Sequence, residues 1–309
     1  YKHTAVSLMK TIIKLIITVL IFILIFRSVD INSVGSAMSN MDIKLVVLAL
    51  AIQLLSTIVA SYRWFLIMKA LQFGQDFLFY FRSYFKGTFF NQGLPTTIGG
   101  DALRVMDVAR LGFKKRESFY GIFIDRIVGL LGLLLLNLMA NGLNPDLLEK
   151  KFFYLINGIV LLSIFGVLVV MALKKIRILE NHRLGKLFFD LSIRLNTVYR
   201  KVDDAAIQIS LSIAIHLLSI VSIFVLGKSV GLEYDLLTYL VIMPPVFLLT
   251  LIPVSLAGWG VREGAMLGLF LLIGADKTLV LTISLMYGII VLTTSLPGMY
   301  FYLKGNRTL

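Results

Sequence analysis

The sequence contains no cysteine, only three histidines and few charged residues for its length. Without cysteine the chain cannot form a disulfide, a thiolate metal site or a cysteine nucleophile, and any redox compartment suits it. Charged residues make up 15% of the 309 positions and hydrophobic residues 58%, whereas soluble globular proteins have about 25% charged and about 45–50% apolar residues. This composition excludes an ordinary soluble domain.

The hydrophobic residues are collected in long runs, several of which reach the roughly 20 residues that a helix needs to cross a hydrocarbon layer about 30 Å thick. The first run is too long for the apolar core of a signal peptide and has no small-residue cleavage site before Asp30, so we interpret it as a retained helix. The fold class that follows is an all-α polytopic membrane protein with about six full transmembrane helices. The predicted spans are 8–27, 43–62, 118–140, 152–173, 205–226 and 278–302.

Two further apolar regions, 77–111 and 236–275, are interrupted by residues that break helices. The first is broken around Pro95 and the second around Pro253. A proline removes a backbone donor and disfavours the helical conformation in the residue before it, and the glycines that follow let the backbone turn and approach closely. We therefore expect each region to form a re-entrant helical hairpin that returns to its own side of the membrane.

The distribution of Lys and Arg supports this layout. With the N-terminus in the cytoplasm and both broken regions returning to their own side, 22 of the 30 basic residues lie in cytoplasmic segments and only 6 in external ones. Such an excess is typical of cytoplasmic loops. A single crossing at 77–111 would place Lys114, Lys115 and Arg116 outside and weaken the bias. We expect a multi-pass protein of the cell (inner, cytoplasmic) membrane with both termini in the cytoplasm.

The segment 174–203 is too charged to span a membrane. Apolar residues recur at helical spacing among its basic residues, which predicts an amphipathic helix at the cytoplasmic interface. A solvated connecting helix explains the same pattern, so both interpretations stay open. The whole chain, 1–309, is then a single integral membrane domain.

The two broken regions resemble each other in sequence. In the ten residues that begin at Pro95 and at Pro253, the proline, one glycine and the final arginine are identical, and five other positions match by type. Because the two hairpins enter from opposite sides, 1–173 and 204–309 would be halves of an inverted repeat. Such repeats are typical of alternating-access transporters, in which paired broken helices mark the substrate site. The alternative is a pair of packing kinks with structural glycines.

Each break is followed by a short helix whose N-terminus we expect to face a binding site. Free N–H groups and the positive end of the helix dipole attract anions there. The two helices begin near Asp101 and near Gly260, so Arg104 and Arg262 lie in their first turns. Irregular backbone at membrane depth persists only where it is buried in protein or lines a cavity. The pattern therefore predicts an anion site.

The acidic residues beside these arginines have two interpretations. Asp101 and Glu263 can cap the short helices, or they can neutralise the arginines when no substrate is bound. The substrate-binding residues predicted at the two breaks are Asn91, Gly99, Gly100, Asp101, Arg104, Gly258, Gly260, Arg262 and Glu263.

Two more charged residues, Asp125 and Arg126, lie inside the predicted span 118–140. Neighbours in a helix point in different directions, so we expect each to find its partner elsewhere. Charge inside a membrane is by default a candidate functional site, and a structural salt bridge between helices is the alternative. His216, in the middle of 205–226, is expected to be a hydrogen-bonded residue of the bundle rather than a proton relay.

At these residues the sequence resembles the transmembrane (flippase-like) domain of lysylphosphatidylglycerol synthases, the multiple peptide resistance factor group, and related stand-alone membrane proteins. The matching residues are Asn91, Pro95, Gly99-Gly100-Asp101-Ala102-Leu103-Arg104, Asp125-Arg126, Pro253 and Gly260-Val261-Arg262-Glu263. The resemblance covers most of the chain and implies a lipid-translocating fold with two re-entrant hairpins. It does not imply the synthase reaction, which belongs to a separate soluble domain.

The main functional hypothesis is a flippase-like transporter that moves an anionic phospholipid or a lipid-linked head group between leaflets, with the phosphate at Arg104 and Arg262. One alternative is a membrane-embedded transferase acting on a lipid carrier, for which Asp101 and Asp125 are candidate bases. The other is a non-transporting scaffold for a cell-envelope enzyme. We expect no enzymatic activity, no cofactor, no metal and no nucleic acid partner. The expected partners are membrane lipids, anionic ones above all, and a homo-oligomer stays open.

Overall fold

A computed structural model describes residues 2–93, 99–181, 183–252, 255 and 257–305 of the chain. This part of the chain is all-helical, with twelve α-helices, two short 3₁₀ helices and no strand, which confirms the predicted class. The α-helices are α1 (Lys2–Ser28), α2 (Ile31–Ser39), α3 (Ile43–Ala70), α4 (Phe77–Gly93), α5 (Gly99–Ala109), α6 (Lys115–Leu143), α7 (Lys150–Ala172), α8 (Arg183–Val198), α9 (Val202–Ser229), α10 (Leu236–Thr250), α11 (Val261–Leu271) and α12 (Lys277–Gly305).

Five of these helices, α3, α6, α7, α9 and α12, are long and apolar enough to cross a membrane. The pair α1 and α2, bent by 87°, makes a sixth crossing if it is one span. Each of the six predicted spans coincides with α1, α3, α6, α7, α9 or α12. The chain is therefore a multi-pass membrane protein, as its hydropathy predicts.

Two features of these helices differ from the sequence prediction. The apolar run Trp64–Met68 carries α3 past its predicted end to Ala70. Arg63 therefore lies within the helix, where it is buried. The short α2 is absent from the prediction. It begins after Asp30, whose carboxylate accepts hydrogen bonds from two backbone N–H groups of its first turn.

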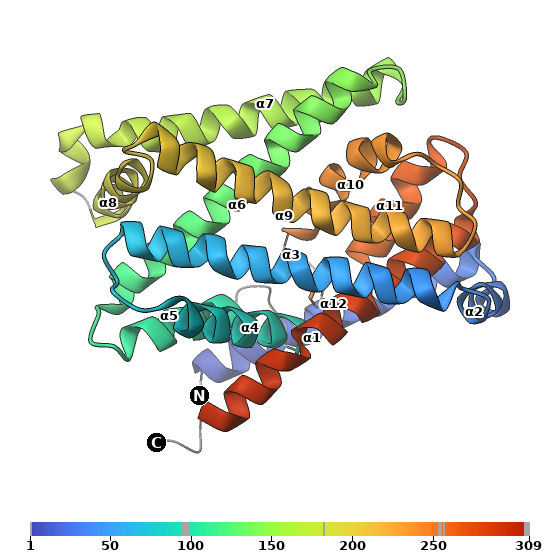
Figure 1. The fold of residues 1–309 in the computed structure, drawn as a ribbon, viewed down its shortest axis with the longest axis horizontal. Coiled ribbons are helices and arrows are strands. Elements are labelled where there is room, and N and C mark those ends of the chain that lie inside the picture. Colours follow the sequence, from blue (N-terminus) through green and yellow to red (C-terminus); the bar gives the residue numbers. More distant parts are fainter. Residues whose placement is uncertain (1, 94–98, 182, 253–254, 256, 306–309) are drawn as a thin grey trace.

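The helices α3 and α9 run side by side through the middle of the bundle (Figure 1) and are joined by polar contacts. The hydroxyl group of Ser56 donates to a carbonyl of α9 at 2.9 Å, and that of Ser222 donates to the carbonyl of Ala49 at 2.8 Å. The helix α6 approaches α9 at Gly132, where an added Cβ would lie 2.3 Å from the Cβ of Ser212. Small residues at such contacts let the backbones of membrane helices pack closely.

The two broken regions form pairs of short helices. The first pair, α4 and α5, is in close contact where an added Cβ on Gly100 would lie 1.9 Å from the carbonyl oxygen of Gly87. A Cβ on Gly298 of α12 would lie 1.9 Å from another carbonyl oxygen of α4. In Figure 1, α4 and α5 lie toward the left end of the elongated bundle, and α10 and α11 toward its right end. Pro95 and Pro253 lie outside the described residues.

The segment 174–203 contains the amphipathic helix α8. Leu191 and Leu195 on its apolar face are buried against residues of α3 and α6. The side chains of Ser192 and Asn196 donate to the carbonyl of Met171 at the end of α7, each at 2.9 Å. The helix is therefore docked on the bundle through both apolar and polar contacts.

Candidate functional site

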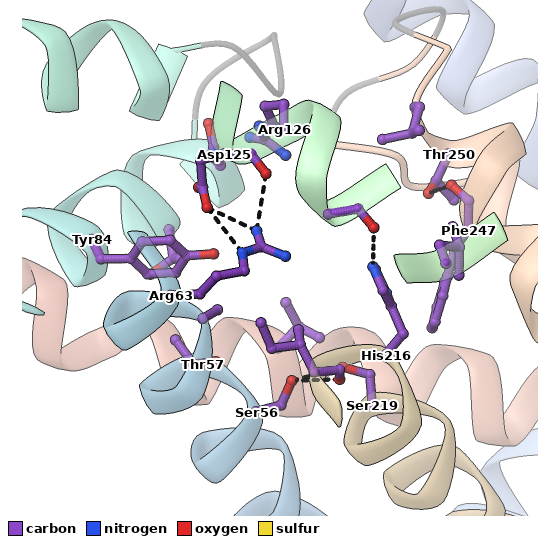
Figure 2. Close-up of a pocket in the computed structure, with 18 of the residues that line it drawn as sticks. Ser56, Thr57, Arg63, Tyr84, Asp125, Arg126, His216, Ser219, Phe247 and Thr250 are labelled. Atoms are coloured by element: carbon purple, nitrogen blue, oxygen red, sulfur yellow. Dashed lines mark hydrogen bonds and ion pairs between the residues drawn. The ribbon is translucent and has the colours of Figure 1, made fainter. Parts of the chain in front are cut away.

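A cavity of about 520 Å³ lies between the central helices. Its lining comes from α3, α4, α5, α6, α9, α10 and α12, so both pairs of short helices contribute to it. Figure 2 shows Asp125 and Arg126 on one side and Ser56 and Ser219 on the opposite side. The wall has a charged part, a neutral part rich in hydroxyl groups, and an apolar part.

The charged part begins at Arg63 of α3, whose guanidinium group points at Asp125 of α6 (Figure 2). Its Nε and Nη2 atoms donate to Oδ1 of Asp125 at 3.1 and 2.8 Å, and Nη2 also donates to the Asp125 carbonyl at 3.1 Å. Its Nη1 donates to the hydroxyl group of Ser212 on α9 at 3.0 Å. The side chains of Arg63 and Asp125 are 6% and 2% exposed. This buried arginine therefore joins three helices.

A second arginine, Arg104 of α5, binds the other carboxylate oxygen of Asp125. Its Nη2 donates to Oδ2 of Asp125 at 2.8 Å, and its Nη1 donates to Asp101 at 3.1 Å. Its guanidinium carbon lies 4.0 Å from the centre of the Trp64 ring and 4.7 Å from that of Tyr84. Aromatic faces at this distance stabilise a buried cation. One aspartate is thus shared by two arginines.

The chain of charges ends at Arg126, whose Nε donates to Oδ2 of Asp101 at 2.8 Å. In the order Arg63, Asp125, Arg104, Asp101, Arg126 the residues alternate in sign, with one more arginine than aspartate. We call these five residues the charged part. Because it contains three arginines and two aspartates, its net charge is +1. Arg126 has the most exposed side chain of the five, at 45%, and lines the cavity.

At the N-terminus of α5, one of the free backbone N–H groups already has a hydrogen-bond partner within the protein. The side-chain oxygen of Asn91 on α4 accepts a hydrogen bond from the backbone N–H of Gly100 at 2.8 Å. The carboxylate of Asp101 is used in ion pairs with two arginines. Gly99, the first residue of α5, faces a smaller cavity beside Lys86. The arginine side chains, rather than the helix end alone, thus present positive charge to the main cavity.

At the start of α11, Glu263 has both of the roles considered for it. Its Oε2 accepts from the backbone N–H of Gly260 at 2.6 Å, and its Oε1 accepts from Nε of Arg262 at 3.1 Å. Gly258 and Gly260 have φ values of 82° and 83°, which glycine adopts without strain. The guanidinium carbon of Arg262 lies 5.8 Å from the ring centre of Tyr287. Tyr287 lines the cavity, whereas Arg262 is not among the described residues that do so.

The second polar part of the wall carries no charge, and we call it the hydroxyl part. The hydroxyl oxygens of Ser56 and Ser219 lie 3.0 Å apart, and the hydroxyl group of Tyr287 donates to the side-chain oxygen of Gln53 at 3.2 Å. Ser56 donates to a backbone carbonyl of α9, so its oxygen keeps lone pairs that can accept from a ligand. The hydroxyl part consists of Gln53, Ser56, Ser219, Tyr287, Thr294 and Ser295.

His216 of α9 lies near both polar parts. Its Nε2 is 2.9 Å from the carbonyl oxygen of Gly129 on α6, as Figure 2 shows. The expectation of a hydrogen-bonded residue of the bundle is confirmed.

The apolar part of the wall comes mainly from α6 and from the end of α10. The residues are Phe123, Ile127, Leu130, Leu133, Phe247, Leu251 and Val291. Phe123 is 39% exposed and Leu251 is 51% exposed. The apolar wall therefore continues to the outside of the bundle, where the acyl chains of a lipid would lie.

The structure brings together only some of the residues predicted from the sequence. Asn91, Arg104, Asp125 and Arg126 line the cavity, and Asp101 binds two of them, Arg104 and Arg126. The prediction that Asp125 and Arg126 find separate partners is confirmed, because Asp125 binds two arginines and Arg126 binds Asp101.

Arg63, Tyr84 and the hydroxyl part were not predicted from the sequence. Arg63 has apolar residues on both sides, including the run that follows it. This signal indicates that the span continues through Arg63 and that the arginine needs a partner inside the bundle. Scattered serines and threonines in a span give no comparable signal.

Among the residues that the structure describes, no three His, Asp or Glu side chains are grouped so that they could hold a metal ion. The family model for the lysylphosphatidylglycerol synthase TM region matches residues 11–298, which is most of the chain. A comparison with curated proteins found no significant match.

Proposed function

We propose that this chain, which belongs to the lysylphosphatidylglycerol synthase TM region family, moves an anionic phospholipid or a lipid-linked head group between the two leaflets of a membrane. The observation that carries the proposal is the cavity among the membrane-spanning helices. It combines a charged part of net charge +1 with an apolar wall that reaches the outside of the bundle. A lipid has the same two parts, a polar head group and apolar chains.

In this proposal Arg126 is the first group that meets the phosphate. Its side chain is the most exposed of the charged part, and its Nε donates to the carboxylate of Asp101. A phosphate oxygen accepts hydrogen bonds from a guanidinium group in the same bidentate manner as a carboxylate. The phosphate therefore competes with Asp101 for Arg126, while Asp101 keeps its bond to Arg104.

We further propose that the two pairs of short helices are re-entrant hairpins of an inverted repeat. Their positions toward opposite ends of the bundle in Figure 1 support this. Each pair also has an arginine bound to a carboxylate in the first turns of its second helix, Arg104 with Asp101 and Arg262 with Glu263. In folds of this kind, movement of one half against the other exposes the site to each side in turn. The contacts between the two halves, such as those of Arg63 with Ser212 and of His216 with the carbonyl of Gly129, would have to change in such a movement.

The orientation belongs to the same proposal. We place both termini in the cytoplasm and the chain in the cell (inner, cytoplasmic) membrane, because the basic residues are concentrated in the segments on the side of the N-terminus.

Of the two alternatives, a transferase needs a carboxylate that is free to act as a base. The two candidate bases, Asp101 and Asp125, are both bound by arginines, which favours transport. A scaffold needs no cavity at all.

The test of transport is a reconstitution in vesicles with a variant that changes the charge of the cavity and keeps its ion pairs. In Arg126→Gln, Asp101 retains Arg104 and Asp125 retains Arg63, so the protein should fold. The charged part becomes neutral, and we expect the movement of acyl-labelled phosphatidylglycerol to slow by about tenfold or more, since a hydrogen bond to a charged group contributes about 1.5–3 kcal/mol. Arg126→Lys should restore part of the rate, because Lys lacks the bidentate fork.

The matched control is Arg116→Gln. Arg116 lies on the same helix, is 48% exposed and binds one aspartate, Asp190, at 3.0 Å, yet it does not line the cavity. Its rate should equal that of the unmodified protein. The proposed function is wrong if the wild-type protein is folded and inserted but moves no labelled lipid. It is also wrong if Arg126→Gln moves the lipid as fast as Arg116→Gln does.

A further inference from the structure

The cavity holds a definite number of charges. The charged part has three arginines and two aspartates, and every other side chain that lines the cavity is neutral. His216 counts as neutral because none of the ion pairs among the described residues joins it to a carboxylate, and an unpaired histidine is neutral at pH 7. The residues of the two breaks that lie outside the described part, 94–98, 253–254 and 256, include no charged residue in the sequence.

The cavity offers no carboxylate for a cationic head group. All 17 aspartate and glutamate residues of the chain lie in the part that the structure describes. Only Asp125 lines the cavity, and Asp101 is bound by Arg104 and Arg126. Asp125 binds two arginines through both oxygens. An ammonium group that entered would add a second unbalanced positive charge to a site surrounded by membrane helices, which is costly.

The hydroxyl part lies on the side of the cavity opposite Asp125 and Arg126, as Ser56 and Ser219 show in Figure 2. Its groups are neutral and include the side chain of Gln53, which has both a donor and an acceptor. A ligand group that binds here must therefore both donate and accept hydrogen bonds without carrying charge. Hydroxyl groups meet this requirement.

From these three observations we infer that the cargo carries one net negative charge: it is a phosphodiester lipid whose remaining head group is uncharged and bears hydroxyl groups. This inference rests on the proposed function and names its substrate class. A monoanion brings the charge of the cavity and ligand together to zero. A zwitterionic amine lipid leaves it at +1, an aminoacylated lipid with two amines raises it to +2, and a phosphomonoester dianion lowers it to −1.

The family takes its name from synthases of lysylphosphatidylglycerol, a lipid with a lysyl head group. Lysylphosphatidylglycerol carries two ammonium groups, and the structure offers neither of them an unpaired carboxylate at the cavity. This chain should therefore prefer the unmodified hydroxyl-bearing lipid.

The experiment compares four acyl-labelled lipids in phosphatidylcholine vesicles that contain the purified full chain. The probes are phosphatidylglycerol, phosphatidylethanolamine, lysylphosphatidylglycerol and phosphatidic acid, with the label on the acyl chain so that each head group is intact. Phosphatidylglycerol should move roughly tenfold faster than each of the others. One unbalanced unit charge in the occupied cavity should cost at least about 1.4 kcal/mol of binding free energy, which corresponds to a factor of about ten. Equal or faster movement of either amine-bearing lipid would overturn the inference and leave the proposed function standing.

A binding measurement separates the inference from the proposed function. The detergent-solubilised protein is mixed with the four lipids at equal concentration, and the retained lipids are identified by native mass spectrometry. Preferred retention of phosphatidylglycerol supports the inference even if no lipid moves in vesicles, an outcome that would refute transport alone. Equal retention of all four lipids refutes the inference.

A variant tests the same charge count from the protein side. Gln53→Glu keeps the size of the side chain and places a negative charge in the hydroxyl part, where Gln53 is 8% exposed. The preference for phosphatidylglycerol over lysylphosphatidylglycerol should fall by about tenfold or reverse. The control Gln75→Glu makes the same change at an exposed position outside the cavity and should keep the wild-type preference. An unchanged preference in folded Gln53→Glu would contradict the inference.

Discussion

Asp125 is the residue whose replacement should damage the fold most directly. It is 2% exposed and binds Arg63 and Arg104, which come from two different helices and are themselves buried. In Asp125→Asn the side chain keeps its shape but loses its charge. Arg104 retains Asp101 as a partner, whereas Arg63 retains only neutral acceptors, including the hydroxyl group of Ser212.

The expected loss of stability follows from this difference. Breaking a buried ion pair by removing one partner costs about 3–5 kcal/mol. The amide oxygen of the asparagine can still accept one hydrogen bond from Arg63, so we expect a value near the lower limit, about 3 kcal/mol. Asp190→Asn is the control. Asp190 binds Arg116 near the surface, with side chains 30% and 48% exposed, and such pairs contribute about 0–1 kcal/mol.

The assay is equilibrium unfolding of the purified protein in mixed micelles, measured for the two single variants and for the double variant Asp125→Asn with Arg63→Gln. The double variant removes the orphaned cation, so it should be less destabilised than the sum of its single variants by at least about 1 kcal/mol. The reasoning is refuted if Asp125→Asn and Asp190→Asn have the same free energy of unfolding. It is also refuted if the losses of stability in Asp125→Asn and Arg63→Gln simply add in the double variant.

Two further predictions concern packing and topology. Gly100→Ala should destabilise the protein by roughly 1–3 kcal/mol, because its Cβ would lie 1.9 Å from the carbonyl oxygen of Gly87; Gly264→Ala, which has open space around its Cβ, should leave stability unchanged or raise it by up to about 1 kcal/mol. Wild-type stability in Gly100→Ala would contradict the close contact of α4 and α5. For topology, a membrane-impermeant maleimide should label Glu233→Cys from outside and Lys115→Cys only after permeabilisation, since both side chains are exposed and the chain has no native cysteine. External labelling at position 115 would reject the re-entrant reading of the first hairpin.

The sequence by itself determined the class of the protein and the position of its long helices. A run of about 20 apolar residues can satisfy its backbone inside a membrane only as a helix, so hydropathy alone located the six predicted spans. It also determined that Asp125 and Arg126 need partners elsewhere, because adjacent residues of a helix point in different directions. These are local consequences of chain geometry and solvent.

Only the tertiary structure decided which partners these are. Arg63 lies 62 positions before Asp125 in the chain, and neither periodicity nor charge count relates two helices that far apart. The similarity of the two breaks in sequence suggested that Arg104 and Arg262 share one site, yet Arg104 lines the cavity, whereas Arg262 is bound by Glu263 and is not among the described residues that line it. The net charge of the cavity, on which its ligand depends, results from side chains of three helices whose packing brings them together. Pairing of this kind is a property of the assembled bundle and not of any single segment.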